Sequence, residues 1–330
     1  MANVTIIGGG VAGMAAAGVL TKRGHEVTLM ERDSKLGGHV GKWYKVFPDI
    51  TDASEIVDEL KGDLNGVKIK TNADVKEIEK SGKKFKVNGT SADAVLIAAG
   101  FEPFDATLKE EYGYGIYDNV VTSLELDEML KTGKLKTKDG KTPKSVGLVH
   151  CVGSRDEKVN NNYCSRVCCT NVIKSGIEIK EHYPGTDVFC FYMDVRAYGR
   201  GYEELYRKSQ EECGVTFIRS RLSEANENAD KTLLLRVEDT LAGKPMKINV
   251  DLLVLMVGMC PSVNAGSLKN SIGLETGDDR FFKTKNKHSA NNESNIPGVF
   301  YAGATTGPKS IVESITDGRA AAAEIHSYLS

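Results

Sequence analysis

The sequence predicts an α/β protein of two Rossmann-like domains, one inserted in the other. A β-type run at residues 3–7 leads directly into Gly8, Gly10 and Gly13 of the pattern G-x-G-x-x-G, which is typical of a nucleotide-binding βαβ unit. Two later segments, residues 91–104 and 248–262, share an Asp, a buried apolar run, a Gly and a Pro, which indicates two similar domains. The length of 330 residues suits two cores better than one.

The composition excludes several classes of protein. The chain carries 43 Lys and Arg against 45 Asp and Glu, and the basic residues are scattered, so neither nucleic acid nor an anionic membrane is expected as a partner. The longest apolar runs, such as residues 252–259, are far shorter than the roughly 20 residues of a spanning helix. The N-terminus goes straight into a strand rather than a signal peptide. We therefore expect a cytoplasmic protein, in which thiols stay reduced.

The first glycine motif has the full context of a dinucleotide site. An Ala-rich helix to about residue 23 follows the glycines, and a second strand ends at Glu31, 18 positions after Gly13. The glycines would let the backbone approach a pyrophosphate at the helix N-terminus, and Glu31 could accept the ribose hydroxyls. The alternative is a glycine-rich turn that binds no ligand. Such a turn would not require the observed order of strand, glycines, helix, second strand and acidic residue.

Later segments favour FAD over NAD as the dinucleotide. The run ERDSKLGGHVGKW at residues 31–43 resembles the second flavin-contacting turn of the thioredoxin-reductase-like flavoproteins, which have two dinucleotide-binding domains. In those proteins a segment like residues 91–104 closes the FAD domain. The resemblance implies flavin contacts at Arg32, Gly38, Val75, Ala99, Gly100, Gly303, Lys309, Ser310 and Ile311, with Val75 near the adenine.

The C-terminal stretch, residues 296–329, would return the chain to the flavin domain. A strand ends at Gly303, and a helix begins near Ser310, where Ser310 and Glu313 form an S-x-x-E capping box. The positive end of this helix could stabilise negative charge on a reduced flavin. Ser310 could equally serve only as a cap. The expected domains are residues 1–110 and 276–330 for FAD, with residues 111–275 as the inserted module.

The inserted module lacks its own glycine fingerprint. After the strand at residues 145–149, where a nicotinamide site would need G-x-G-x-x-G, the sequence reads HCVGSR. Ligands bind at the carboxyl ends of strands in such folds. The loss of the glycines and the presence of Cys151 there predict a change of cofactor.

Four of the seven cysteines fall within nineteen residues, spaced C-x12-C-x3-C-C. They are Cys151, Cys164, Cys168 and Cys169. Four thiolates suit zinc or an iron-sulfur cluster, and the adjacent pair favours the larger [4Fe-4S] cube, because two neighbouring cysteines seldom bind one small tetrahedral ion. Zinc, a smaller cluster, a redox disulfide and inert thiols remain alternatives.

Other polar residues near these sites have less specific signals. Arg155 and Arg166 could offset the charge of a thiolate-bound cluster, or could only make surface pairs. Cys190, Cys213 and Cys260 stand alone in or beside apolar runs and are expected to be core cysteines. Neither His39 nor His150 has a partner pattern that marks an acid or base, and no catalytic residue is assigned.

The sequence resembles the A subunit of heterodisulfide reductase over nearly its whole length. The blocks that carry the resemblance are GGGVAGMAAA, ERDSKLGGHVGK, HCVGSRD, YCSRVCC and AGATTGPKSIVESI. The resemblance implies a [4Fe-4S] cluster bound by Cys151, Cys164, Cys168 and Cys169. It also implies HdrB/HdrC-like partner proteins and a homodimer.

Within that family the chain is similar to the compact A-like subunit of the sulfur-oxidising complex. It contains no C-x2-C-x2-C run, and residues 44–57 lack the cysteines that the methanogen-type subunit carries there. This resemblance adds a lipoate-binding protein as a partner; the A subunit of the quinone-interacting complex is less similar. The function implied is that of an oxidoreductase subunit that passes electrons between FAD and the cluster in sulfur-compound oxidation.

Two other functions remain open from the sequence. One is an NAD(P)H-dependent disulfide reductase with Cys168 and Cys169 as a vicinal redox pair, against which the missing second fingerprint stands. The other is a scaffold in a larger complex whose cofactors only stabilise the assembly.

Overall fold

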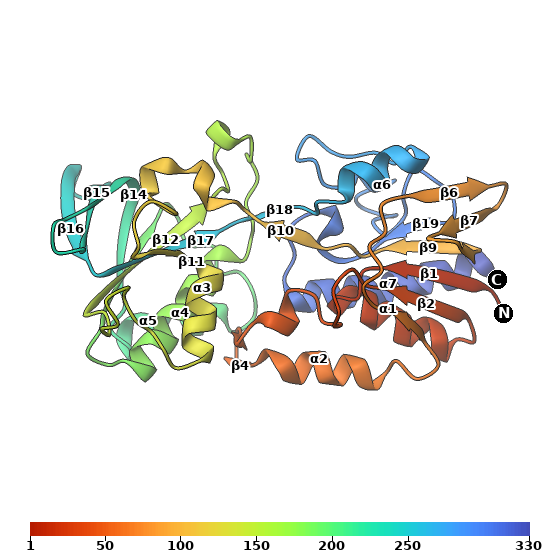
Figure 1. The fold of residues 1–330 in the computed structure, drawn as a ribbon, viewed down its shortest axis with the longest axis horizontal. Coiled ribbons are helices and arrows are strands. Elements are labelled where there is room, and N and C mark those ends of the chain that lie inside the picture. The colour runs from red at the N-terminus through yellow and green to blue at the C-terminus, as the bar shows by residue number, and fades with distance from the viewer. The chain divides into compact units, whose positions relative to one another are not determined.

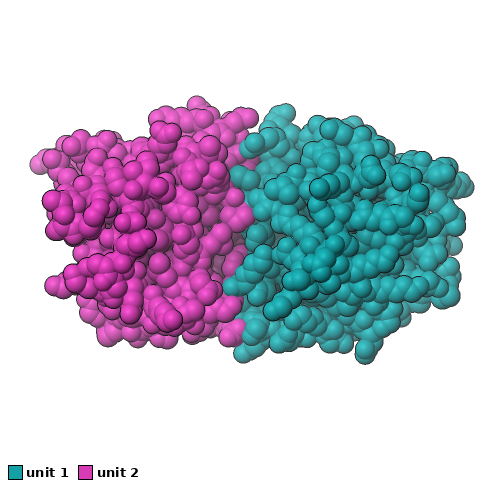
Figure 2. All heavy atoms as spheres, in the orientation of Figure 1, with its two compact units in different colours: residues 1–42, 53–102, 260–330 teal, residues 43–52, 103–259 magenta.

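The structure is a computed structural model that describes residues 1–330, in which the chain forms two compact units (Figures 1 and 2). Unit 1 comprises residues 1–42, 53–102 and 260–330, and unit 2 comprises residues 43–52 and 103–259. These boundaries differ from the expected 110 and 275. Residues 103–110 join unit 2 because the Phe104 amide donates to the Gly258 carbonyl at 2.9 Å. Residues 260–275 join unit 1, where the Ile78 amide donates to Ser271 Oγ at 3.2 Å.

Unit 1 is built on a five-stranded parallel sheet in the order β19-β9-β1-β2-β5. The central strands are runs of apolar residues because both faces of the sheet are covered. The strands are β1 (Asn3–Ile7), β2 (Glu26–Met30), β5 (Lys68–Lys70), β9 (Ala94–Ile97) and β19 (Val299–Tyr301). A separate antiparallel sheet contains β6 (Ile78–Ser81), β7 (Lys84–Val87) and β8 (Thr90–Ala92).

Helix α1 (Val11–Lys22) is buried between neighbours on nearly all sides, as its content of Ala and Gly allows. It packs against α7 (Ile311–Leu329), and the two helices approach closely at Gly318. A Cβ on Gly318 would lie 2.2 Å from the Ala12 carbonyl oxygen, so no larger residue fits. Unit 1 also contains α2 (Ala53–Gly62), α6 (Ala265–Ile272) and the short 3-10 helices at Val40–Lys42 and Gly303–Thr306.

Unit 2 has a seven-stranded sheet in the order β11-β17-β12-β13-β14-β15-β16. The first five strands run parallel, and β15 and β16 continue the sheet antiparallel. The strands are β11 (Val120–Thr122), β12 (Ser145–Val152), β13 (Asp187–Tyr192), β14 (Thr216–Glu227), β15 (Leu233–Asp239), β16 (Lys244–Val250) and β17 (Leu252–Val257). The chain passes between the units at four points, two of which lie within the strands β10 (Phe101–Pro103) and β18 (Met259–Pro261).

The helices of unit 2 are α3 (Ser123–Lys131), α4 (Cys168–His182) and α5 (Tyr202–Glu211), with 3-10 helices at Ala106–Leu108, Glu110–Tyr112 and Glu157–Val159. The chain segment 43–52 is part of this unit and forms a small hairpin of β3 (Lys45–Val46) and β4 (Thr51–Asp52). No helix of the protein has both the length and the apolar character that crossing a bilayer requires.

A buried charge cluster fixes the 43–52 hairpin on α4. The Lys174 ammonium lies 2.9 Å from Glu178 Oε2 and 3.2 Å from Asp127 Oδ1, and it donates to the Lys45 carbonyl at 3.1 Å. The Tyr44 amide donates to the other Asp127 oxygen at 2.7 Å. Lys174 and Glu178 are 2% and 0% exposed, so both charges depend on each other for solvation.

We predict that Lys174→Met lowers the free energy of unfolding by about 3–5 kcal/mol, because two carboxylates are left buried without their cation. Urea unfolding followed by circular dichroism measures this. The half-exposed pair Lys208–Glu181 provides the control, and Lys208→Met should cost less than about 1 kcal/mol. Equal losses in the two variants would contradict the role of burial.

Candidate functional site

The residues expected to hold a dinucleotide follow four neighbouring parallel strands of unit 1. Gly8 follows β1, Glu31 follows β2, residues 98–100 follow β9 and Gly303 lies two residues beyond β19. These strands are adjacent in the sheet order β19-β9-β1-β2. Because the carboxyl ends of parallel strands share one edge, the four segments meet there, which is where ligands bind in α/β sheets.

The glycine turn is tightly packed at two of its three motif positions. A Cβ on Gly13 would lie 1.9 Å from the Gly8 carbonyl oxygen, and one on Gly8 would lie 2.2 Å from the Ala98 carbonyl oxygen. These two glycines serve close packing of helix and strand. Gly10 is different, because it forms the N-cap of α1 and its Cβ would meet nothing within 4 Å. The space beside Gly10 is therefore available to a ligand at the helix N-terminus.

A second glycine turn adjoins the first. The Gly37 amide donates to the Gly9 carbonyl at 2.9 Å, and Gly10 and Gly37 form a β-bridge. Gly38 has a φ of 56°, and its Cβ would lie 3.1 Å from the Gly10 Cα. The structure thus brings together the two glycine runs that the sequence singled out.

Glu31 is buried beside the glycine turn and accepts two backbone hydrogen bonds. Its Oε2 accepts from the Gly9 amide at 2.6 Å, and its Oε1 accepts from the Asp33 amide at 2.8 Å. The carboxylate is thereby oriented at the end of β2, in the position from which an acidic residue can contact a ribose.

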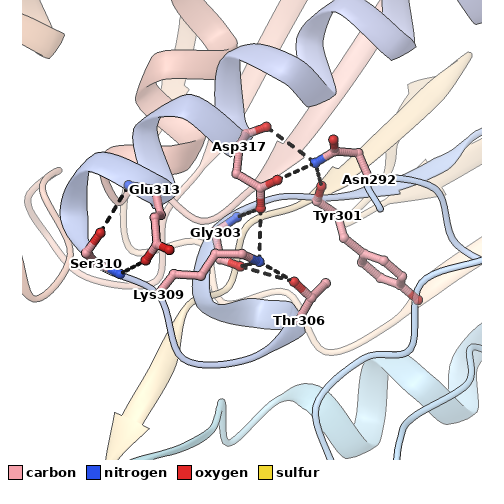
Figure 3. A network of polar contacts seen from close by, with 8 residues as sticks. All are labelled: Asn292, Tyr301, Gly303, Thr306, Lys309, Ser310, Glu313 and Asp317. Atoms are coloured by element: carbon pink, nitrogen blue, oxygen red, sulfur yellow. Dashed lines mark hydrogen bonds and ion pairs between the residues drawn. The ribbon is translucent and has the colours of Figure 1, made fainter. Parts of the chain in front are cut away.

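The segment from Gly303 to Ser310 is organised by a polar network (Figure 3). The Asp317 carboxylate accepts from the Gly303 amide at 2.8 Å and pairs with the Lys309 ammonium at 3.1 Å. Lys309 also donates to the Gly303 carbonyl at 2.9 Å, which closes the turn before α7. The network fixes the backbone between the end of β19 and the start of α7.

The capping box predicted at the start of α7 is confirmed. Ser310 Oγ accepts from the Glu313 amide at 3.2 Å, and Glu313 Oε2 accepts from the Ser310 amide at 2.8 Å (Figure 3). Helix α7 begins at Ile311, so the positive end of its dipole lies at Lys309–Ile311.

The other predicted flavin contacts differ in accessibility. Val75 is 3% exposed within a hydrophobic cluster of unit 1, so a ligand would meet its backbone rather than its side chain. Arg32 is partly exposed and pairs with Glu102 at 2.7 Å. Ala99 is half-buried, and Gly100 adopts a φ of 68° after β9. His39 lies at the same end of the sheet, where its Nε2 contacts the Phe101 carbonyl at 2.9 Å.

Two residues of the polar network were missed by the sequence reasoning. Asp317 lies in the second turn of α7, and Asn292 lies in a loop that precedes β19. Asn292 Nδ2 donates to Asp317 Oδ1 at 2.8 Å and to the Tyr301 carbonyl at 3.0 Å (Figure 3). Neither position belongs to a local motif. The one available signal was an acidic residue, Asp317, one helical turn after Glu313 of the capping box.

The four clustered cysteines converge in unit 2 where β12 meets α4. Cys151 interrupts β12 with a φ of 59°, and the pairing of β12 with β17 shifts register between Val149 and Val152. Cys168 and Cys169 open α4, and Cys164 lies in the preceding loop. Cys151, Cys168 and Cys169 are buried, whereas Cys164 is partly exposed.

The thiols interact strongly with one another. A hydrogen bond from Cys168, helped by the positive charges of Arg155 and Arg196, lowers the pKa of Cys151 although burial opposes this. The same contact with Cys151, together with burial and the charges of Cys169 and Cys164, raises the pKa of Cys168. Burial raises the pKa of Cys169 to about 11. Four thiolates could coexist here only with a compensating positive charge.

The residues around the four clustered cysteines can be compared with those that an iron-sulfur cluster needs. No group of three or more His, Cys, Asp or Glu side chains forms a site that could hold a metal ion. The donors are nevertheless four soft thiols in mutual interaction, the type that iron-sulfur clusters use. Both ring nitrogens of the adjacent His150 are buried without a hydrogen-bond partner, although buried polar groups normally have one. These residues fit a thiolate-bound cluster in ligand type and number.

The remaining cysteines lie apart from this group. Cys190 is fully buried in the core of unit 2, as expected, and burial raises its pKa. Cys213 packs at the edge of the same core and is half-buried, as is Cys260. The expectation of core cysteines is thus correct for Cys190 and too strong for the other two.

Comparison with protein families places these observations in a known group. The model of the pyridine nucleotide-disulphide oxidoreductases matches residues 2–139 and 191–320. The residues between the two matched segments include all four clustered cysteines. The chain therefore departs from the general pattern of that family at its cysteine-rich stretch.

Curated relatives are the A subunits of heterodisulfide reductases. The chain is 44% identical over 238 residues to the iron-sulfur A subunit of the CoB–CoM heterodisulfide reductase of Methanocaldococcus jannaschii, and the match covers 70% of this chain and 36% of that protein. It is 31% identical over 422 aligned positions to an iron-sulfur A subunit of the CoB–CoM heterodisulfide reductase of Methanopyrus kandleri, and that match covers 98% of this chain and 63% of that protein. The chain thus spans about a third of the first relative's length.

Solved structures confirm the predicted fold class. The thioredoxin reductase of T. acidophilum aligns with a TM-score of 0.70 at 19% identity, over 99% of both chains. The thioredoxin reductase of Lactococcus lactis aligns with a TM-score of 0.69 at 19% identity, over 100% of this chain and 99% of that one. The fold is that of a two-domain FAD/NAD(P) protein, and the family match falls into two segments.

Gly10 offers a test of the dinucleotide site that leaves the fold intact. We predict that Gly10→Ala lowers the FAD content of the purified protein at least about tenfold, because the new methyl group occupies the space where a pyrophosphate must approach the backbone. FAD released on denaturation is measured by absorbance. Gly62→Ala, at another position where a Cβ meets nothing, is the control and should retain FAD. Normal flavin content in the Gly10 variant would place the cofactor elsewhere.

Proposed function

Because the chain belongs to the pyridine nucleotide-disulphide oxidoreductase family, we propose that it is a flavoprotein subunit that exchanges electrons between FAD and a [4Fe-4S] cluster. FAD supplies two-electron chemistry when bound, and the cluster supplies one-electron chemistry. The observation that carries the proposal is the convergence of Cys151, Cys164, Cys168 and Cys169 at the end of β12, where a nicotinamide site would need glycines.

The residues of unit 1 would hold the flavin in defined roles. Gly10 leaves room for the pyrophosphate, Gly38 packs closely against Gly10 beside it, and Glu31 accepts hydrogen bonds from the ribose hydroxyls. The start of α7, with Lys309 and Ser310, presents positive charge to the isoalloxazine ring. Asp317 keeps Lys309 in place through its ion pair. Through these contacts the protein would bind the flavin and raise its tendency to accept electrons.

The relatives support a proposal for the biological setting. The curated matches are named as subunits of heterodisulfide reductases, which supports a role in a multi-subunit complex. We propose HdrB/HdrC-like partners and a lipoate-binding protein, and sulfur-compound oxidation in the cytoplasm as in the compact A-like subunits. We also propose a homodimer, by analogy with flavoproteins of this architecture.

An NAD(P)H-dependent disulfide reductase is the second candidate function. Its support is the thioredoxin-reductase fold together with the adjacent buried thiols of Cys168 and Cys169. In that case NADH or NADPH would bleach the flavin absorbance within seconds under anaerobic conditions. The electron-transfer proposal expects no such rapid bleaching.

Iron and sulfide content tests the main proposal. Protein prepared without oxygen should contain about four irons and four acid-labile sulfides per chain. Replacement of any one of Cys151, Cys164, Cys168 or Cys169 by Ala should abolish the reduced-cluster EPR signal while FAD remains bound. Cys213→Ser is the matched control and should retain the signal. A wild-type protein that binds no iron even after anaerobic reconstitution would refute the cluster.

A further inference from the structure

The loop that joins β13 to α5, residues 193–201, lies against the clustered cysteines. The Cys169 thiol donates to the Asp194 carbonyl at 3.6 Å, and the backbone N–H of Arg196 donates to the Cys169 sulfur. The Arg196 side chain in turn hydrogen-bonds Cys164. This loop therefore contacts the buried thiol of Cys169 through its backbone, and the partly exposed thiol of Cys164 through the Arg196 guanidinium.

Asp194 holds the positively charged side chains of this region in place. Its Oδ1 pairs with Arg155 at 2.5 Å, and its Oδ2 pairs with Arg196 at 3.3 Å. The guanidinium of Arg196 carries its positive charge at any physiological pH, as arginine does in proteins, and Asp194 holds it close to the thiols. A single carboxylate thus pairs with both arginines near the thiols.

The two arginines that the sequence singled out have other contacts. Arg155 is bound to Asp194. The Arg166 guanidinium lies over the Tyr198 ring, and its Nε donates to the Tyr198 hydroxyl at 2.8 Å, while its backbone N–H donates to Cys164 at 3.3 Å. Arg196 is a third cation near the thiols, and its side chain contacts the Cys164 sulfur directly. No sequence motif indicated Arg196.

We propose that Arg196 is a positioning residue that raises the reduction potential of the [4Fe-4S] cluster at its Cys164 corner, and that Asp194 sets the orientation of its guanidinium. The inference rests on the proposed function. Uptake of one electron from the reduced flavin adds one negative charge next to Cys164 without forming or breaking a bond. A fixed positive charge and a hydrogen bond to the ligating sulfur both favour that reduced state.

An EPR-monitored redox titration of the anaerobic protein with dithionite and mediators tests this proposal. Arg196→Met should reduce the equilibrium constant for one-electron reduction about tenfold, a fall in midpoint potential of about 59 mV. Arg196→Lys retains the charge and should recover at least half of the shift. Because the Arg196 side chain is 42% exposed, the difference should shrink as salt rises.

Two further variants separate an electrostatic role from a structural one. A double variant tests the role of Asp194: if Asp194 acts through Arg196, the fall in potential caused by Arg196→Met should be smaller in the Asp194→Asn background than in the wild-type protein. Arg200→Met removes an exposed arginine of the same loop and should leave the potential unchanged. If Arg196→Met loses the cluster, Arg196→Lys still reports the sign of the effect, because lysine keeps the positive charge but lacks the guanidinium fork.

The outcomes distinguish this inference from the function on which it rests. A wild-type protein without iron would refute the cluster itself. A protein that holds its cluster, but whose Arg196→Met potential equals that of Arg200→Met, would refute the role of Arg196 alone.

Discussion

The arrangement of this protein depends on one constraint, namely that parallel strands deliver their carboxyl ends to a common edge of the sheet. In unit 1 this edge collects the glycine turn after β1, the carboxylate after β2 and the network around Gly303. In unit 2 the same edge collects Cys151 at the end of β12 and the loop after β13. Since α4 starts beside β12, its first two residues reach that edge as well.

This geometry explains how loops at one edge of a sheet can carry different chemistry on the same scaffold. A nicotinamide site needs a glycine turn after the first strand of its domain, so that the backbone can approach a pyrophosphate. Here β12 is instead interrupted at Cys151, whose positive φ redirects the chain. Ser154 and Ser165 then fasten the following loop, because their hydroxyls lie 2.5 Å apart and Ser165 accepts from the Met259 amide at 2.8 Å. Cys151 therefore lies at an irregular end of β12, and side-chain hydrogen bonds hold the loop that follows it.

Much of this organisation could be predicted from local sequence patterns. The glycine fingerprint, the acid after β2 and the capping box at Ser310 are short motifs whose geometry follows from backbone chemistry, and the structure forms each one. The clustered cysteines were evident from spacing alone. Asp194, Arg196 and Asp317 were not, because each acts through a contact with a residue distant in sequence.

The domain boundaries were harder to predict for a related reason. Residues 43–52 lie within the sequence of the first domain, yet they belong to unit 2 because Lys174 and Asp127 bind the hairpin. A buried ion pair between residues 47 positions apart has no periodic signature in the sequence. Only the folded structure brings the hairpin and α4 together.

The pairing of α1 with α7 has a consequence for the synthesis of the chain. Helix α1 precedes all of unit 2 in the chain, whereas its partner α7 and the edge strand β19 follow unit 2. At roughly 5–20 residues per second, the apolar surface of α1 waits on the order of 15–60 s for its cover. All of unit 2 is made during that interval and can fold meanwhile. The nascent chain therefore carries an incomplete, hydrophobic unit 1 while unit 2 is being made, a period in which chaperones or rapid folding of unit 2 would protect it from aggregation.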